Sequence, residues 1–134
     1  MSTLAVGTIK SVSSAAPVFQ NTSGTEKGQL AKVWCLYNGA NNTVLDSFNT
    51  TSVTDNGTGD FTINFSASFS NANYAVGSST AGSSNADSIV ICGVAGGTAS
   101  SDKTTSALRF QVRYTPSNSL QDSDRVSNIC FGDN

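Results

Sequence analysis

Two segments of the chain alternate strictly between apolar and polar residues, which is the pattern of a β-strand that buries one face. They are Phe61–Phe65 and Leu108–Tyr114. Strands that bury one face and expose the other to water are typical of antiparallel sheets. We expect the apolar side chains of both segments to point inward and to form the core. This set is Phe61, Ile63, Phe65, Leu108, Phe110, Val112 and Tyr114.

Further strands are expected where short apolar runs lie between turn signals such as Asn38-Gly39 and Gly96-Gly97. Residues 30–37 are apolar on nearly both faces, which favours a central strand, and we expect Trp34, the only tryptophan, to lie in the core. The remaining candidate strands are residues 43–48, 73–76, 88–92 and 125–131. The pattern therefore predicts an all-β fold: an antiparallel β-sandwich or jelly-roll-like body with an extended N-terminal segment.

The first 28 residues differ in character from the rest of the chain. Leu4, Val6, Ile9 and Val12 are apolar, but Gly, Ser and Thr separate them. A terminal strand with so few apolar side chains has to bury them against the body or against a partner chain. We therefore divide the chain into an assembly segment, residues 1–28, and a sandwich domain, residues 29–134. We predict that these four apolar side chains mediate assembly.

The composition excludes several classes of partner. Charged residues make up only 12% of the chain, while 22 Ser, 15 Thr and 13 Asn supply a turn-rich composition that disfavours helices. The net charge is −2 and the few basic residues are scattered, so no basic stripe is available for nucleic acid. No stretch approaches the about 20 apolar residues of a membrane span. We expect neither nucleic-acid binding nor membrane insertion.

The chain offers little catalytic chemistry. It has no histidine, which removes Ser-His-Asp and Cys-His nucleophile pairs and every mechanism with a His general base. A lysine or carboxylate base stays chemically open, but Glu26, the only glutamate, lies in a polar segment. We therefore predict that the protein is not an enzyme, that it has no catalytic residue and that it needs no cofactor.

Metal ligands are equally sparse. Cys35, Cys92 and Cys130 are far apart and have no CxxC spacing, so we predict no zinc site. The sequence favours buried thiols that act as small apolar residues, with one disulfide plus one free thiol as the alternative. Residues 55–60 alternate oxygen ligands with glycines, as a calcium loop does, but the calcium pattern is incomplete. A β-turn with positive φ at Asn56-Gly57 is the favoured interpretation.

The aromatic residues Trp34, Tyr37 and Tyr74 have two interpretations. They are a set on which a sugar ring stacks, or they are packing residues, with Trp34 in the core and the tyrosines at rim or interface positions. The spacing does not decide between the two, and packing is the commoner use of such residues. No binding residue is predicted from the sequence.

Several motifs from Lys32 onward resemble those of a known family. Residues 32–39 stand as Lys-Val-Trp-Cys-Leu-Tyr-Asn-Gly, and residues 47–65 contain Thr-Asp-Asn-Gly-Thr-Gly-Asp-Phe-Thr-Ile-Asn-Phe. Ala-Asn-Tyr-Ala-Val follows at 72–76, and residues 126–132 end in an aromatic residue and glycine. Together they resemble a virion surface domain of tailed bacteriophages and prophages, especially cyanophages, of the tail-fibre-like type. Cys35-Leu36 departs from that pattern, where Val-Asn is usual.

The resemblance implies a virion component that forms a β-sandwich and a homotrimer and contacts other virion proteins of the tail or capsid. The leading hypothesis is a trimeric tail-fibre-type surface protein that attaches to a host, with a host surface glycan as a further partner. The alternative is a capsid decoration protein that stabilises the phage head, and a third is a free carbohydrate-binding module. Copy number per particle separates the first two.

Overall fold

The computed structural model describes residues 7–9, 18–20, 22–24, 26–81, 90–94 and 102–132. Over these residues the regular secondary structure consists of eleven strands, and no helix is present. The strands are β1 Val18–Gln20, β2 Glu26–Gln29, β3 Val33–Asn38, β4 Thr43–Phe48, β5 Thr50–Gly57, β6 Asp60–Phe65, β7 Ala75–Thr80, β8 Val90–Val94, β9 Ala107–Tyr114, β10 Ser119–Leu120 and β11 Val126–Phe131. In this part of the chain no helix is long and apolar enough to cross a membrane.

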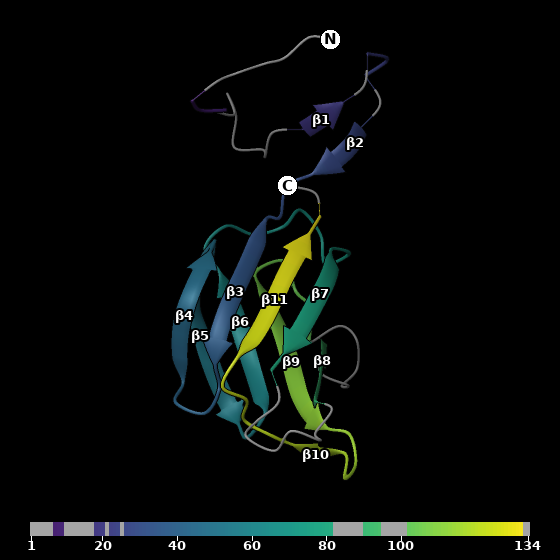
Figure 1. Cartoon of the computed structure of the whole chain (residues 1–134). Helices are drawn as coiled ribbons and strands as arrows, with labels where there is room; N and C mark the ends of the chain where they lie inside the picture. Colours follow the sequence, from purple (N-terminus) through teal and green to yellow (C-terminus); the bar gives the residue numbers. More distant parts are fainter. Residues whose placement is uncertain are drawn as a thin grey trace.

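Two antiparallel sheets form the body of the protein (Figure 1). The four-stranded sheet has the order β4-β3-β11-β7. The five-stranded sheet has the order β10-β9-β6-β5, with β8 also paired to β9. The chain passes between the sheets several times, so that strands distant in sequence, such as β3 and β11, become neighbours. The structure confirms the predicted all-β antiparallel fold.

The core lies between the sheets, where the alternation of β6 and β9 places it. Their inward residues are all buried, at 8% exposure or less: Phe61, Ile63, Phe65, Leu108, Phe110 and Val112. The ring of Phe61 lies between those of Tyr37 and Phe110, with centroids 5.0 Å and 5.6 Å away. Tyr114 follows the same alternation but is only half-buried, because it lies at the end of β9.

The position of Trp34 differs from the expectation. Val33, Cys35 and Tyr37 of β3 point into the core, so Trp34 and Leu36 lie on the outer face and are only partly buried. The prediction that Trp34 belongs to the core is wrong. Strand β3 is central, between β4 and β11, as its apolar sequence suggested. A strand that is apolar on both faces does not reveal which face lies inside.

A second aromatic cluster closes one end of the sandwich. The rings of Phe69 and Tyr74 stack with centroids 4.3 Å apart, and Phe65 meets both edge-on. The ammonium groups of Lys32 and Lys103 lie 4.7 Å from the rings of Phe69 and Tyr74, respectively. Each ammonium also donates a hydrogen bond to a backbone carbonyl, which holds it in place over its aromatic ring.

Strands β1 and β2 form a separate antiparallel hairpin. It stands beyond one end of the sandwich, where the chain leads into β3 (Figure 1). Among the four residues predicted for assembly, Leu4, Val6 and Val12 lie outside the described residues, and Ile9 is 62% exposed.

Two of the three cysteines are described with their side chains. Cys35 and Cys130 are free thiols, and both are buried in the core. Burial raises the pKa of Cys35 to about 11 and that of Cys130 to about 12. Both thiols are therefore neutral at physiological pH and pack as small apolar residues. Cys92 belongs to β8, but its side chain lies outside the described residues.

Candidate functional surface

The outer face of the four-stranded sheet carries an unusual row of side chains. The register aligns Phe48 of β4 with Trp34 of β3, Trp34 with Ile129 of β11, and Ile129 with Gly77 of β7. Because paired residues of adjacent strands point to the same side, Phe48, Trp34 and Ile129 form one apolar row across the sheet. We call the outer face of β4, β3, β11 and β7 the apolar face.

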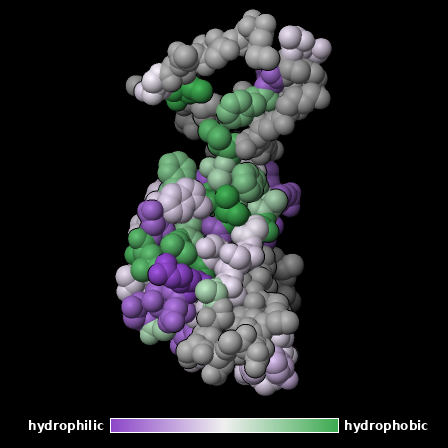
Figure 2. Space-filling model, in the orientation of Figure 1, coloured by the Kyte–Doolittle hydropathy of each residue, from purple (hydrophilic) through white to green (hydrophobic). Residues whose placement is uncertain are grey.

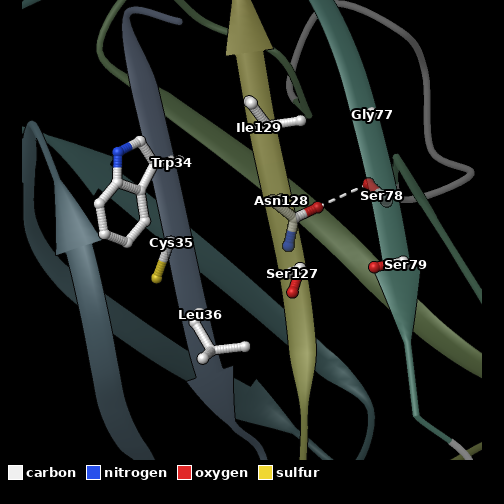
Figure 3. A pocket seen from close by; sticks show the side chains of 9 residues that line it. All are labelled: Trp34, Cys35, Leu36, Gly77, Ser78, Ser79, Ser127, Asn128 and Ile129. Carbon is white, nitrogen blue, oxygen red and sulfur yellow. Dashed lines mark hydrogen bonds between the residues drawn. The ribbon is translucent and has the colours of Figure 1, made fainter.

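A shallow groove of about 530 Å³ crosses this face (Figure 3). Gly77 forms a low point in it, since a Cβ there would lie 3.2 Å from Cγ2 of Ile129. The groove has hydroxyl groups in Ser127 and Ser79 and apolar walls, and none of its residues is charged. They are Trp34, Cys35, Leu36, Gly77, Ser78, Ser79, Ser127, Asn128 and Ile129.

The apolar surface extends beyond the groove. On the outer side of this sheet Phe48 is 54% exposed, and Ile129 and Phe131, two residues apart on β11, are each 37% exposed. Figure 2, which views this face, shows apolar residues gathered over its upper part and hydrophilic residues toward its lower left. A contiguous apolar patch on a soluble domain is typical of an interaction site.

The outer face of the five-stranded sheet has the opposite character. Asp60 of β6 is paired through both carboxylate oxygens with Arg109 of β9, at 2.8 Å to Nε and 2.8 Å to Nη2. Gln111 also donates to Asp60, and Arg113 donates to Gln111, at 2.9 Å and 2.8 Å. Toward β5, Asn64 donates to the hydroxyls of Ser52 and Thr54. This face is hydrogen-bonded within itself and is suited to contact with water.

The contacts of Asp60 explain why its carboxyl group has a lowered pKa. The hydrogen bond from Arg109 is the main reason why the pKa of Asp60 lies below its usual value, and burial opposes that shift. Gln111 and Asn56 add donors that also favour the charged carboxylate. A carboxylate held in its charged form by three side chains links β6, β9 and the β5–β6 turn. It is poorly placed to act as a general acid.

Asp60 makes stability depend on pH. Because its pKa is lower in the folded state than in the unfolded chain, the charged carboxylate stabilises the fold above the unfolded pKa of about 4. We expect this contribution to be lost as the pH falls through the folded pKa. Asp60→Asn should lower stability at neutral pH and reduce the loss on acidification. Urea unfolding of both proteins between neutral and acidic pH measures this, and parallel pH profiles would contradict it.

Residues 55–60 form the end of β5, a turn at residues 58–59 and the start of β6. Gly57 and Gly59 have positive φ, at 130° and 63°, whereas Asn56 does not. The carboxylate of Asp55 accepts hydrogen bonds from Asn42 and from the backbone NH of Gly57. The oxygens that suggested calcium ligands thus hold the turn together. No group of three or more His, Cys, Asp or Glu side chains among the described residues is placed to hold a metal.

The structure does not bring the three aromatic residues of the proposed sugar platform together. Tyr37 and Tyr74 are 1% and 2% exposed, and their hydroxyls donate to Asn42 and to the carbonyl of Ala107. Burial is the main reason why the pKa of Tyr37 is raised to about 12. The assignment of Trp34 to the core and of the tyrosines to the rim is therefore reversed. Only Trp34 faces outward.

Sequence reasoning missed the apolar face itself. Trp34 was noted, but Phe48 and Ile129 stand in strands whose inner and outer positions are both partly apolar. Their common location appears only once the register places β4 and β11 on either side of β3. The available signal was that residues 30–37 are apolar on both faces. A strand whose outer face contacts water normally has polar residues on that face.

Comparisons with known proteins add little to this description. No family model matches the chain, and no curated protein matches it. A solved structure with a weak likeness is the phiAB6 tailspike in complex with three-repeated oligosaccharides of Acinetobacter baumannii surface polysaccharide. The TM-score is 0.42 and the identity 15%, over 98% of this chain and 30% of the tailspike. The chain thus spans less than a third of the tailspike's length, and this likeness carries no functional assignment.

Proposed function

We propose that this protein is a structural component of a bacteriophage virion, a tail-fibre-type surface protein that assembles as a homotrimer and contributes to host attachment. Its partners are other copies of itself, neighbouring virion proteins and a host surface glycan. It works by binding and packing, without catalysis and without a cofactor.

The observation that carries the proposal is the motif at residues 47–65. It coincides with the end of β4, the whole of β5 and the whole of β6. Its Gly59 lies against Val112 of β9 and Gln121, and its Asp60 is paired with Arg109 of β9, so the motif takes part in the packing of this fold. The resemblance to phage surface domains therefore rests on residues that hold the sandwich together.

The experiment is to locate the protein in purified phage particles. An antibody against the chain, applied to particles and followed by electron microscopy, should label the tail. Quantitative mass spectrometry should find a few to tens of copies per particle. Label spread over the head with hundreds of copies would replace the proposal with capsid decoration, and absence from particles would refute both.

The N-terminal segment gives a second test of this proposal. Deletion of residues 1–12 should leave the sandwich folded, because β3 to β11 contain the whole core cluster. We expect the truncated chain to lose trimerisation or particle incorporation, since it lacks Leu4, Val6, Ile9 and Val12. Light scattering of the purified protein and its abundance in particles measure these effects. Unchanged values of both would mean that the segment has no role in assembly.

A further inference from the structure

The two outer faces of the sandwich differ in what they can contact. On the five-stranded sheet the polar side chains form hydrogen bonds with one another, so that face can be exposed to water without a further partner. On the four-stranded sheet, the row Phe48–Trp34–Ile129 has no further layer of the chain covering it among the described residues. Leaving such apolar groups in contact with water is unfavourable, and covering them is the main driving force of protein association.

We propose that the apolar face is the surface through which copies of this chain associate. The inference deepens the proposed function, because it assigns the self-association assumed there to particular residues. Its centre is the row Phe48–Trp34–Ile129, with Phe131 two residues beyond Ile129 on β11 and Leu36 two residues beyond Trp34 on β3.

The charge of the face favours a second copy as the occupant. No charged residue lines the groove, and Asp46, opposite Leu36, lies in the next row. A nucleic acid or a strongly charged protein would find no complementary charge at the centre. A second copy brings a surface of the same uncharged, apolar chemistry, and the interfaces within homo-oligomers are more apolar than other protein interfaces.

The area of the face sets how much of an interface it can supply. Its four strands have six residues each, and with strands about 4.8 Å apart and about 3.3 Å per residue they present roughly 400 Å² of flat sheet. Each partner in a standard interface buries about 800 Å². The face therefore supplies about half of an interface, and a second surface must contribute.

The β1–β2 hairpin is placed to provide that second surface. It stands beyond the end of the sandwich (Figure 1), and an isolated two-stranded hairpin is only marginally stable in water. Phe19 on β1 is 47% exposed, and Leu30, which follows β2, is 50% exposed. Both the hairpin and the apolar face thus expose apolar side chains in a single chain, and association of copies would bury both.

The test uses the full chain and two variants of the apolar row, Phe48→Ser and Ile129→Thr. Both side chains are partly exposed, so the folded monomer should persist, and far-UV circular dichroism checks this. The control is Thr54→Ala, an exposed strand position on the outer face of the other sheet. Sedimentation over a wide concentration range gives the dissociation constant. The emission of Trp34, the only tryptophan, reports whether the face is covered.

We expect the unaltered chain to be oligomeric, and each variant to raise the dissociation constant by about tenfold or more, as truncation of central interface residues does. Thr54→Ala should leave the constant unchanged, and Trp34 emission should move to longer wavelength on dilution together with dissociation. An oligomer that both variants leave intact would overturn this inference while the virion assignment stood. A monomeric chain would overturn it too, and a change in Trp34 emission on addition of cellotetraose would then identify the face as a sugar site.

Discussion

Phe110→Ala is expected to lower the free energy of unfolding by about 3–5 kcal/mol, the cost of removing a large aromatic side chain from a packed core. Phe110 is 0% exposed and lies on β9 between the sheets. Its ring centroid is 5.6 Å from that of Phe61, so the truncation leaves a cavity that this rigid neighbour cannot easily fill. Urea unfolding at neutral pH measures the effect.

Trp34→Ala is the matched control, because it removes an even larger ring from the outer face. For the dissociated chain we expect a loss of about 1–2 kcal/mol, within the ordinary range for point substitutions. The reason is that Trp34 is already partly in contact with water in the folded monomer. Equal losses for the two variants would mean that Trp34 packs in the core and that the register of β3 described above is wrong.

The core was predictable because β6 and β9 encode it twice. Each has a clean period of two, each has its large apolar residues on one face only, and the two strands pair directly with each other. A shift of one residue in either strand would place its apolar side chains in water. The sequence is therefore compatible with only one pairing register. The same logic fails for β3, whose two faces are both apolar, and Trp34 was misplaced for that reason.

Strand β5 was missed because its sequence lacks an apolar pattern. It runs from Thr50 to Gly57 with Val53 as its only large apolar residue, and its last residues have the composition of a turn. Tertiary pairing with β6 holds these residues extended up to Gly57. Asn49, at a φ of 55°, connects β4 to β5. Its side-chain amide donates a hydrogen bond to the carbonyl of Lys32 and accepts one from the backbone NH of Ala67. Such long-range contacts leave no local signal in the sequence.

Several strand boundaries also moved because pairing, not propensity, decides where a strand ends. The strand expected at residues 73–76 is β7, which begins at Ala75 and continues through polar residues to Thr80. Its serines and threonine are held by the partner β11, for example through the bond from Ser78 to Asn128. A polar edge strand of this kind is invisible to a search for apolar alternation. The apolar face could not be predicted for a related reason. Its row of side chains comes from three separate strands, and they align only when the strands pair.

Gly59→Ala should be among the most damaging single-methyl changes in the chain, with an expected loss of about 2–5 kcal/mol. Gly59 has a φ of 63°, which costs an alanine about 1–2 kcal/mol by itself. A Cβ there would also lie 2.5 Å from the backbone N of Gln121 and 2.7 Å from the carbonyl O of Val112. Those two atoms form a hydrogen bond with each other, and the Gly59 carbonyl accepts another from the NH of Val112. The methyl group can therefore be accommodated only if the backbone of β9 at Val112, or the backbone that follows β10 at Gln121, moves.

Gly24→Ala separates the two causes, because Gly24 has a similar φ of 76° but no atom within 4 Å of the added Cβ. We expect Gly24→Ala to cost at most about 1–2 kcal/mol, the conformational part alone. Thermal or urea unfolding of both variants gives the difference, which isolates the steric conflict with β9 and β10. If the two variants lost the same stability, Gly59 would be needed only for its φ. The close approach of the 47–65 motif to β9 would then contribute nothing to the fold. A larger loss for Gly59→Ala means that the motif requires glycine there because a second strand's backbone occupies the space where a side chain would lie.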